Sequence, residues 1–293
     1  MSLNIPTAFV QQYKTITQQL VQQHSSRLRN AVMVENFYGS GAKAIEQVGA
    51  LTAFKLQTRH GPTQHVDTPH SARWIFPTDY AVNDYIDDQD KLRMLIDPQS
   101  IYSKNHRDAL GRAIDDEIIL AATGTAFVGA QGTTTEAFDA NWSIVSGAVG
   151  LTIAKLRQAK RMLMAAENDP DEEYFCVISA DQIEDLLGET LYSSVDYNTV
   201  KPLVDGKMVP FMGFNFIQSE RIALVAGEDA VLAFPRSALM LGLWNDIEVR
   251  VDERPDLNYT TQIYARMSIG ATRTHQMTPT LTQGKIVRIL CVP

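Results

Sequence analysis

The stretch that decides the fold lies near the end of the chain, at residues 247–272: IEVRVDERPDLNYTTQIYARMSIGAT. Apolar and polar residues alternate through 247–252 and, after the turn RPDLN at 254–258, again from Tyr259 to Thr272. This period of two predicts a pair of β-strands. At ~3.3 Å per residue the second strand reaches roughly 50 Å, which is about the diameter of one compact domain of this chain length. Strands of that length are more typical of a flat subunit that contacts neighbouring copies than of the compact core of an enzyme.

Composition places the chain among large, acidic globular proteins. It has 293 residues and a formal net charge of −8, so it is long enough for one large domain or two smaller ones. The negative charge argues against strong free-standing nucleic-acid binding, although a protein can line a compartment that holds DNA without binding it tightly. No apolar run approaches the ~20 residues of a membrane helix, and Met1–Asn4 does not begin a signal peptide. Cys176 and Cys291 lie in apolar runs, which predicts buried free thiols.

Two segments in the first third of the chain predict limbs that reach outward. Residues 7–34 place apolar side chains at spacings of three, four or eight, and the other faces carry glutamines, which predicts a helical arm. Either this helix packs with one solvated face, or it docks onto a partner subunit. Residues 39–86 contain no convincing helix; a strand over Val48–Leu56 and a return strand over Arg73–Phe76 predict an extended hairpin. A two-stranded hairpin is marginally stable alone, so a contact from outside the monomer must hold it.

The rest of the chain predicts one long helix and a mixed α/β block. Asp97-Pro98 begins a helix that ends near Gly124, since a capping carboxylate followed by proline is a strong helix start. Residues 124–135 read as a loop. The α/β block has a helix capped by Thr152, a strand at 174–178, a helix at 179–187, short strands at 208–211, 214–217, 222–225 and 231–234, and a helical turn from 235 to about 244; a last strand covers 285–292.

No set of residues predicts a catalytic, cofactor-binding or metal site. The histidine-rich loop contains His60, His65, Asp67 and His70. The spacing of these histidines matches neither a zinc helix nor a zinc finger. An acidic cluster between Asp79 and Asp90 lacks the central glycine and closing glutamate of a calcium loop. The basic residues between Lys155 and Arg161 either form a solvated helix face or approach packaged nucleic acid.

Several short sequence motifs, taken in their order along the chain, resemble those of a known protein family. They are Ile86-Asp87-Asp88 before Asp97-Pro98, Gly111-Arg112 before Asp115-Asp116, Val177-Ile178-Ser179-Ala180-Asp181-Gln182, Ser194-Val195-Asp196-Tyr197-Asn198, and Arg254-Pro255-Asp256 with Tyr259 and Gln262. Together with the order of elements, they make the chain similar to the major capsid proteins of tailed bacteriophages, in the Hong Kong ninety-seven-type capsid fold, and in particular to a branch found in short-tailed phages. The resemblance covers nearly the whole chain.

The resemblance implies an α+β fold in five segments. These are an N-terminal arm (1–38), an extended two-stranded loop with its return (39–95), a peripheral domain with a long spine helix (96–149), an inserted α/β axial domain (150–244) and the long antiparallel strands of the peripheral domain (245–293). Only about 35 residues precede the extended loop, and the similarity therefore implies a separate scaffolding protein.

The function that the resemblance implies is structural and not enzymatic. The chain is expected to assemble through pentamers and hexamers into the icosahedral head shell around a double-stranded DNA genome. Its partners would be a scaffolding protein, a portal protein and a decoration protein, with assembly in the host cytoplasm. The expected inter-subunit contacts are Phe9, Tyr13, Leu20, Phe54, Arg59, His65, Arg73, Trp74, Arg254 and Asp256. Two alternatives stay open: a metal-dependent or acid–base hydrolase that uses the histidine-rich loop, and the shell protein of an encapsulating nanocompartment.

Overall fold

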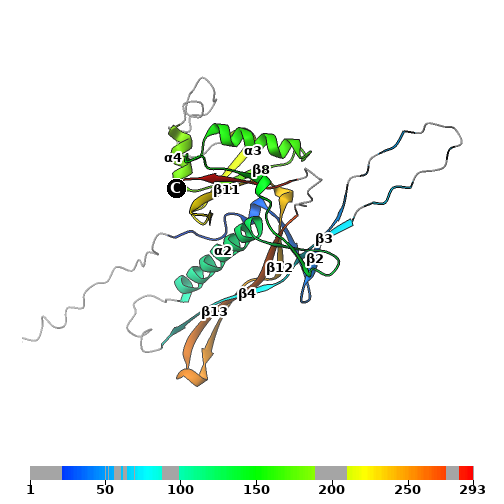
Figure 1. Ribbon diagram of the computed structural model, residues 1–293. Helices are drawn as coiled ribbons and strands as arrows, with labels where there is room; N and C mark the ends of the chain where they lie inside the picture. Colours follow the sequence, from blue (N-terminus) through cyan, green and yellow to red (C-terminus); the bar gives the residue numbers. More distant parts are fainter. Residues whose placement is uncertain are drawn as a thin grey trace, which may run out of the picture. The chain divides into compact units, whose positions relative to one another are not determined.

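A computed structural model describes residues 22–49, 51, 53–55, 61, 65–68, 70–87, 99–188, 210–274 and 284–292 (Figure 1). The chain divides into two compact units. The first unit contains the described parts of residues 1–26, 79–112 and 246–267, and the second contains those of 27–78, 113–245 and 268–293.

The second unit contains a six-stranded sheet with helices packed on it. Its strands are β7 (Ser143–Ile144), β8 (Tyr174–Ile178), β9 (Phe214–Gln218), β10 (Ala223–Val225), β11 (Glu228–Pro235) and β14 (Val287–Cys291), in the order β7-β14-β11-β8-β9, with β10 paired to β11. Helix α3 (Ile153–Ala165) lies along this sheet, and α4 (Ala180–Gly188) follows β8 (Figure 1). One closed core joins side chains of α3 and α4 to alternate residues of β8, among them Leu156, Leu186 and Cys176.

Most of the predicted elements of the α/β block are confirmed. Thr152 caps α3 by accepting a hydrogen bond from the Lys155 N–H at 3.4 Å. The strand and helix predicted at 174–178 and 179–187 are β8 and α4. The predicted strand at 208–211 lies mostly outside the described residues; within it, Phe211 forms only an isolated bridge to Phe214. The final strand β14 pairs with β7 and β11, so the end of the chain completes this sheet.

A second, four-stranded sheet in the same unit carries the predicted hairpin. Its order is β2 (Ala42–Val48), β3 (His70–Ile75), β5 (Ala126–Val128), β6 (Thr134–Glu136). Strands β2 and β3 lie side by side and antiparallel, from the pair Ala42–Ile75 to the pair Val48–His70 (Figure 1). The first predicted strand was placed too late, at Val48–Leu56. It ends at Val48 because β3 offers no pairing partner beyond His70.

The predicted loop at 124–135 is also wrong, because it contains β5 and β6. Strand β5 pairs with β3 through Trp74–Phe127, and β6 pairs with β5. The turn between them has Gly129 and Gly132 at positive φ, a conformation that glycine adopts without steric cost. Strands of three residues carry too little alternation to be recognised in the sequence.

The two long strands are confirmed; the first is longer than predicted, and the second has the predicted length. β12 covers Leu239–Arg254 and β13 covers Thr260–Arg273, within the sheet order β1 (Met33–Asn36), β12, β13, β4 (Thr78–Ile86). In β13 the predicted inward face is buried from Ile263 through Ile269. The helical turn predicted for 235–244 is wrong beyond residue 238. A 3-10 turn covers only Arg236–Ala238, since Met240 to Leu243 pair with β1 as a buried strand.

The long helix is confirmed as α2 (Gln99–Thr123), with 25 residues; its predicted start at Asp97-Pro98 lies outside the described residues. It ends where the Gly124 N–H bonds the Leu120 carbonyl at 2.7 Å. The helical arm is wrong in its described part: residues 22–28 form no helix, a 3-10 turn follows at Arg29–Ala31, and β1 begins at Met33. Residues 7–21 of the predicted arm lie outside the described residues.

Candidate assembly surfaces

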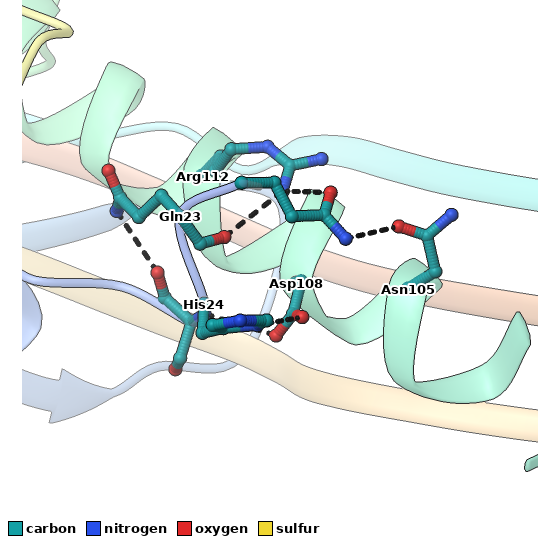
Figure 2. Close-up of polar contacts among 7 residues, drawn as sticks. Gln23, His24, Asn105, Asp108 and Arg112 are labelled. Atoms are coloured by element: carbon teal, nitrogen blue, oxygen red, sulfur yellow. Dashed lines mark hydrogen bonds and ion pairs between the residues drawn. The ribbon is translucent and has the colours of Figure 1, made fainter. Parts of the chain in front are cut away.

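In the first unit, residues 22–25 lie along α2 and are held by a set of polar contacts that we call the arm clamp (Figure 2). Arg112 Nη1 donates to the Gln22 side-chain oxygen at 3.0 Å and to the Gln23 carbonyl at 3.1 Å. His24 Nδ1 lies 2.7 Å from Asp108 Oδ2, and the Ser25 N–H donates to Asp108 Oδ1 at 3.1 Å. The clamp therefore binds the backbone as well as the side chains of the arm.

The clamp is built from one face of the helix. Asp108, Gly111 and Arg112 are spaced three and four residues apart, so they share a face of α2. Gly111 is required there because a Cβ at this position would lie 2.7 Å from backbone atoms of Ser25. Asp108 is 4 % exposed, and a buried carboxylate of this kind must be fully hydrogen-bonded. The arm thus lies against the helix at backbone contact distance.

The second unit contains a similar contact about two turns beyond Asp108 on α2. The buried carboxylate of Asp115 accepts from the Arg27 and Leu28 N–H groups at 3.0 and 3.1 Å. These donors would bond the chain's own carbonyls in a helix. The non-helical path of residues 22–28 follows from carboxylates that accept hydrogen bonds from their N–H groups.

The base of the β2–β3 pair in the second unit is held by buried charge. Arg73 of β3 is 1 % exposed, and its Nη1 lies 2.8 Å from Glu136 Oε2 of β6. Arg273 at the end of β13 is also fully buried, and it donates to the backbone oxygens of Gly124 and Glu136. Burial, followed by repulsion from Arg73, lowers the pKa of Arg273 to about 10. Two guanidiniums and one carboxylate therefore tie β3, β6 and β13 together.

In the first unit, the turn between β12 and β13 is stiffened by a chain of side-chain hydrogen bonds. Arg254 donates twice to Asp256, at 2.8 and 2.7 Å, and once to Gln262 at 3.1 Å. Gln262 then donates to Asn83 of β4 at 2.7 Å. The hydrogen bonds that Arg254 donates to the Asp256 carboxylate raise the pKa of Arg254. The turn presents Leu257 and Tyr259 to solvent, and Tyr259 has φ 61°.

The structure describes only some of the ten residues that were predicted to contact neighbouring subunits. Phe9, Tyr13, Leu20 and Arg59 lie outside the described residues. Phe54 and His65 are exposed beyond the paired part of β2 and β3, and His65 Nε2 lies 2.8 Å from Asp67.

The remaining four predicted contacts have partners inside the chain. Trp74 Nε1 donates to the Gly129 carbonyl at 2.8 Å. Arg73 pairs with Glu136 and Arg254 pairs with Asp256, so their described contacts lie within the subunit. Roles between subunits remain predictions for all ten residues. Asp108, Arg112 and Asp115 were missed as arm-binding residues, although their spacing on one helix face could have indicated them.

We next considered metal-ligating groups, membrane-spanning helices and reactive thiols among the described residues. Among them, no group of three potential metal ligands occurs, and none of their helices is long and apolar enough to cross a membrane. Cys176 and Cys291 are buried free thiols, and burial raises the pKa of Cys291 to about 11. Such thiols are inert as nucleophiles.

The basic residues that the sequence predicts on one face of α3 differ in their exposure to solvent. Lys155 is buried, and its Nζ donates to the carbonyls of Val149 and Gly150 at 2.7 Å each and of Leu290 at 3.0 Å. Arg157 and Arg161 are exposed. Lys155 thus holds the loop before α3 and the strand β14 together, and it is not available to a ligand in solvent.

Comparison with known proteins agrees with this architecture. The family described as phage capsid protein matches residues 5–292. The capsid structure of the cyanophage P-SCSP1u is 16% identical, with a TM-score of 0.72 over 99% of this chain and 95% of that one. The capsid of the cyanophage Pam1 is 13% identical, with a TM-score of 0.72 over 97% and 96%. The capsid of a native GTA particle is 12% identical, with a TM-score of 0.71 over 100% of both chains.

At these identities the solved structures establish the fold, and the family match establishes the relationship. None of the curated proteins gives a significant match. The family match spans the α/β block as well as the long helix and strands, so the hydrolase and nanocompartment alternatives gain no support. The chain belongs to the phage capsid protein family and is a structural subunit that self-assembles into the capsid shell of the virion.

Proposed function

We propose that this chain is the major subunit of an icosahedral head shell of a short-tailed phage, built from pentamers and hexamers around double-stranded DNA. The observation that carries the proposal is the apolar surface beyond the paired strands β2 and β3. Leu51, Phe54 and Val66, which lie beyond the paired strands, are 54%, 41% and 44% exposed, and Val48 at the end of β2 is 62% exposed. Apolar side chains gain free energy of about 25 cal/mol per Å² when a neighbour removes them from water. A limb of this kind completes its burial only on another subunit.

The arm supports the same proposal. The arm clamp and Asp115 hold residues 22–28 on α2, so the chain before residue 22 starts from a defined point on the subunit. The apolar residues Phe9, Tyr13 and Leu20 are proposed to lie on a neighbouring copy. An arm and a loop that each contact a different neighbour make heterologous contacts, which close into rings when the rotation permits.

The domain roles and the further partners follow from the resemblance and complete the proposal. Residues 150–244 would lie near the centre of each capsomer, and residues 96–149 and 245–293 would form its periphery. A scaffolding protein, a portal protein and a decoration protein are proposed partners, with assembly in the host cytoplasm. The net charge of −8 supports weak, non-specific contact with DNA, because like charges keep the packaged genome from adhering to the shell.

The proposal is tested by removing the segment between β2 and β3 while both strands are kept. Residues 53–66 are replaced by a short glycine–serine turn, which leaves β2 and β3 complete. We expect a subunit with unchanged circular dichroism that fails to form closed shells in negative-stain micrographs, while the wild type, expressed with its scaffolding protein, forms them. The matched control replaces Tyr38, an 88% exposed residue outside these strands, with serine. Normal shells from the shortened chain would contradict the proposal.

A further inference from the structure

A pocket of about 470 Å³ opens in the second unit beside the base of the β2–β3 pair. Its lining comes from β3 and the residues after it, from the last turns of α2, from β5 and from the end of β13; it includes Trp74, Phe76, Leu120 and Phe127. Cavities of about 300–1,000 Å³ with mostly apolar walls are the common form of specific binding sites. This one is therefore large enough to receive an aromatic side chain.

The walls of the pocket are apolar, exposed and held in place. Phe76, Phe127 and Leu120 are 40%, 41% and 62% exposed. The Phe76 and Phe127 rings meet edge to face, with centroids 5.1 Å apart, and Phe127 is fixed by the pairing of β5 with β3. An exposed apolar cluster with a rigid backbone is typical of a contact surface. In a chain that assembles into a shell, the nearest source of a cover is another copy.

Two exposed segments of a second copy could cover the pocket: the turn between β12 and β13, and the segment around Phe54. Their charges distinguish between them. Glu117 is the charged member of the pocket lining. The turn between β12 and β13 exposes Leu257 and Tyr259, but residues 252–256 carry three acidic residues and one arginine. The limb around Phe54 carries Lys55 and Arg59 and no acidic residue between 51 and 60. Opposite charges favour the second limb at the Glu117 side of the pocket.

We propose that the pocket receives Phe54 from a second copy of the chain, with Lys55 of that copy beside Glu117. The inference rests on the proposed function, since it names the acceptor for the limb that the proposal lays on a neighbour. An aromatic anchor in a preformed pocket is the usual centre of binding energy at an interface. Edge-to-face contact with Phe76 and Phe127 adds to the burial of the ring.

Disulfide trapping between two single variants tests the pairing. Phe54→Cys and Leu120→Cys subunits are expressed separately and then co-assembled, so that a bond between the two positions can form only between copies. We expect disulfide dimers on a non-reducing gel after mild oxidation of the shells, and no dimers from either variant alone. The native thiols Cys176 and Cys291 are buried, which keeps the background low.

The same experiment with Tyr259→Cys in place of Phe54→Cys tests the competing limb. Dimers formed with Tyr259→Cys and not with Phe54→Cys would overturn the proposal in favour of the β12–β13 turn. Absence of dimers in both mixtures, from shells of normal appearance, would overturn it as well.

A charge exchange gives an independent measurement. Lys55→Glu and Glu117→Lys are each expected to lower the yield of shells by about tenfold, the effect of roughly 1.4 kcal/mol, and the double variant is expected to recover most of it. Two single losses without recovery in the double variant would overturn the Lys55–Glu117 pairing. Loss of shells on removal of residues 53–66, combined with no trapping at Leu120, would refute this pocket while the proposed function stands.

Discussion

The six-stranded sheet and the β2–β3–β5–β6 sheet belong to the same unit, but they differ in how much of their apolar surface is buried within the subunit. In the first sheet, core residues such as Leu163, Phe214 and Val287 are fully buried against the chain's own helices and strands. In the second sheet, Phe127 and the adjoining Phe76 remain 41% and 40% exposed, and its strands are tied together by an ion pair between the buried Arg73 and the partly exposed Glu136. One sheet has a closed apolar core, and the other has an ion-paired base under an open apolar surface.

The difference teaches how one chain can be both a stable domain and an assembly part. Folding of the six-stranded sheet removes its apolar surface from water within the monomer. The β2–β3–β5–β6 sheet is tied by charge instead, which fits the proposal that its open apolar surface is covered by a neighbour. Variants in the two sheets should therefore separate stability from assembly.

The largest expected effect is in the closed core. Phe214→Ala removes a fully buried ring that meets Tyr174 edge to face at 6.2 Å, and it should lower the free energy of unfolding by about 3–5 kcal/mol. Phe127→Ala should lower it by less than about 1 kcal/mol, because the ring is half exposed, yet it should reduce shell formation. Urea unfolding of the unassembled subunit and particle counts measure the two. Equal stability losses would break the comparison.

A second effect should be found at the ion-paired base. Glu136→Gln leaves the buried guanidiniums of Arg73 and Arg273 without the neighbouring carboxylate, which we expect to cost roughly 2–3 kcal/mol of unfolding free energy. Glu46→Gln is the matched control in the same sheet, since Glu46 is 61% exposed and pairs with Lys43. Its cost should stay below about 0.5 kcal/mol. A control that destabilises as much as Glu136→Gln would show that burial of the charge is not the cause.

The smallest effect extends the comparison to the arm. Gly111→Ala favours a helix by its propensity alone, but the new methyl group would lie 2.7 Å from the backbone of Ser25. We expect loss of hydrogen-exchange protection at the Ser25 amide and a net destabilisation of about 1 kcal/mol. Gly188→Ala, where nothing lies within 4 Å of the new methyl group, should show neither. Unchanged protection at Ser25 would mean that the arm does not depend on close approach to α2.

Much of the fold could be predicted from residue patterns. Periodicity was sufficient for α2, periodicity and caps were sufficient for α3, β8 and α4, and alternation was sufficient for the buried apolar face of β13. The family resemblance rested on short phrases that include Gly111-Arg112 and Asp115-Asp116. Arg112 and Asp115 prove to bind the arm, and Gly111 allows it to approach.

The failures share one physical reason. Residues 22–28 of the predicted arm are not helical because carboxylates of α2 take the N–H groups of Ser25, Arg27 and Leu28. Residues 240–243 form a strand because β1 pairs with them, and β5 exists because β3 presents an open edge to it. Each outcome depends on a partner that is distant along the chain.

The order of residues was therefore enough to specify the elements whose stability is local: a capped helix, a run of alternating residues, a glycine stop. It was enough for the family as well, through motifs that keep their order. The non-helical path of residues 22–28, the short strands β5 and β6, and the pocket beside the β2–β3 pair came from long-range contacts in the folded chain. Hydrogen-bond donors bind whichever acceptor the fold brings nearest, and that acceptor is not a neighbour in sequence.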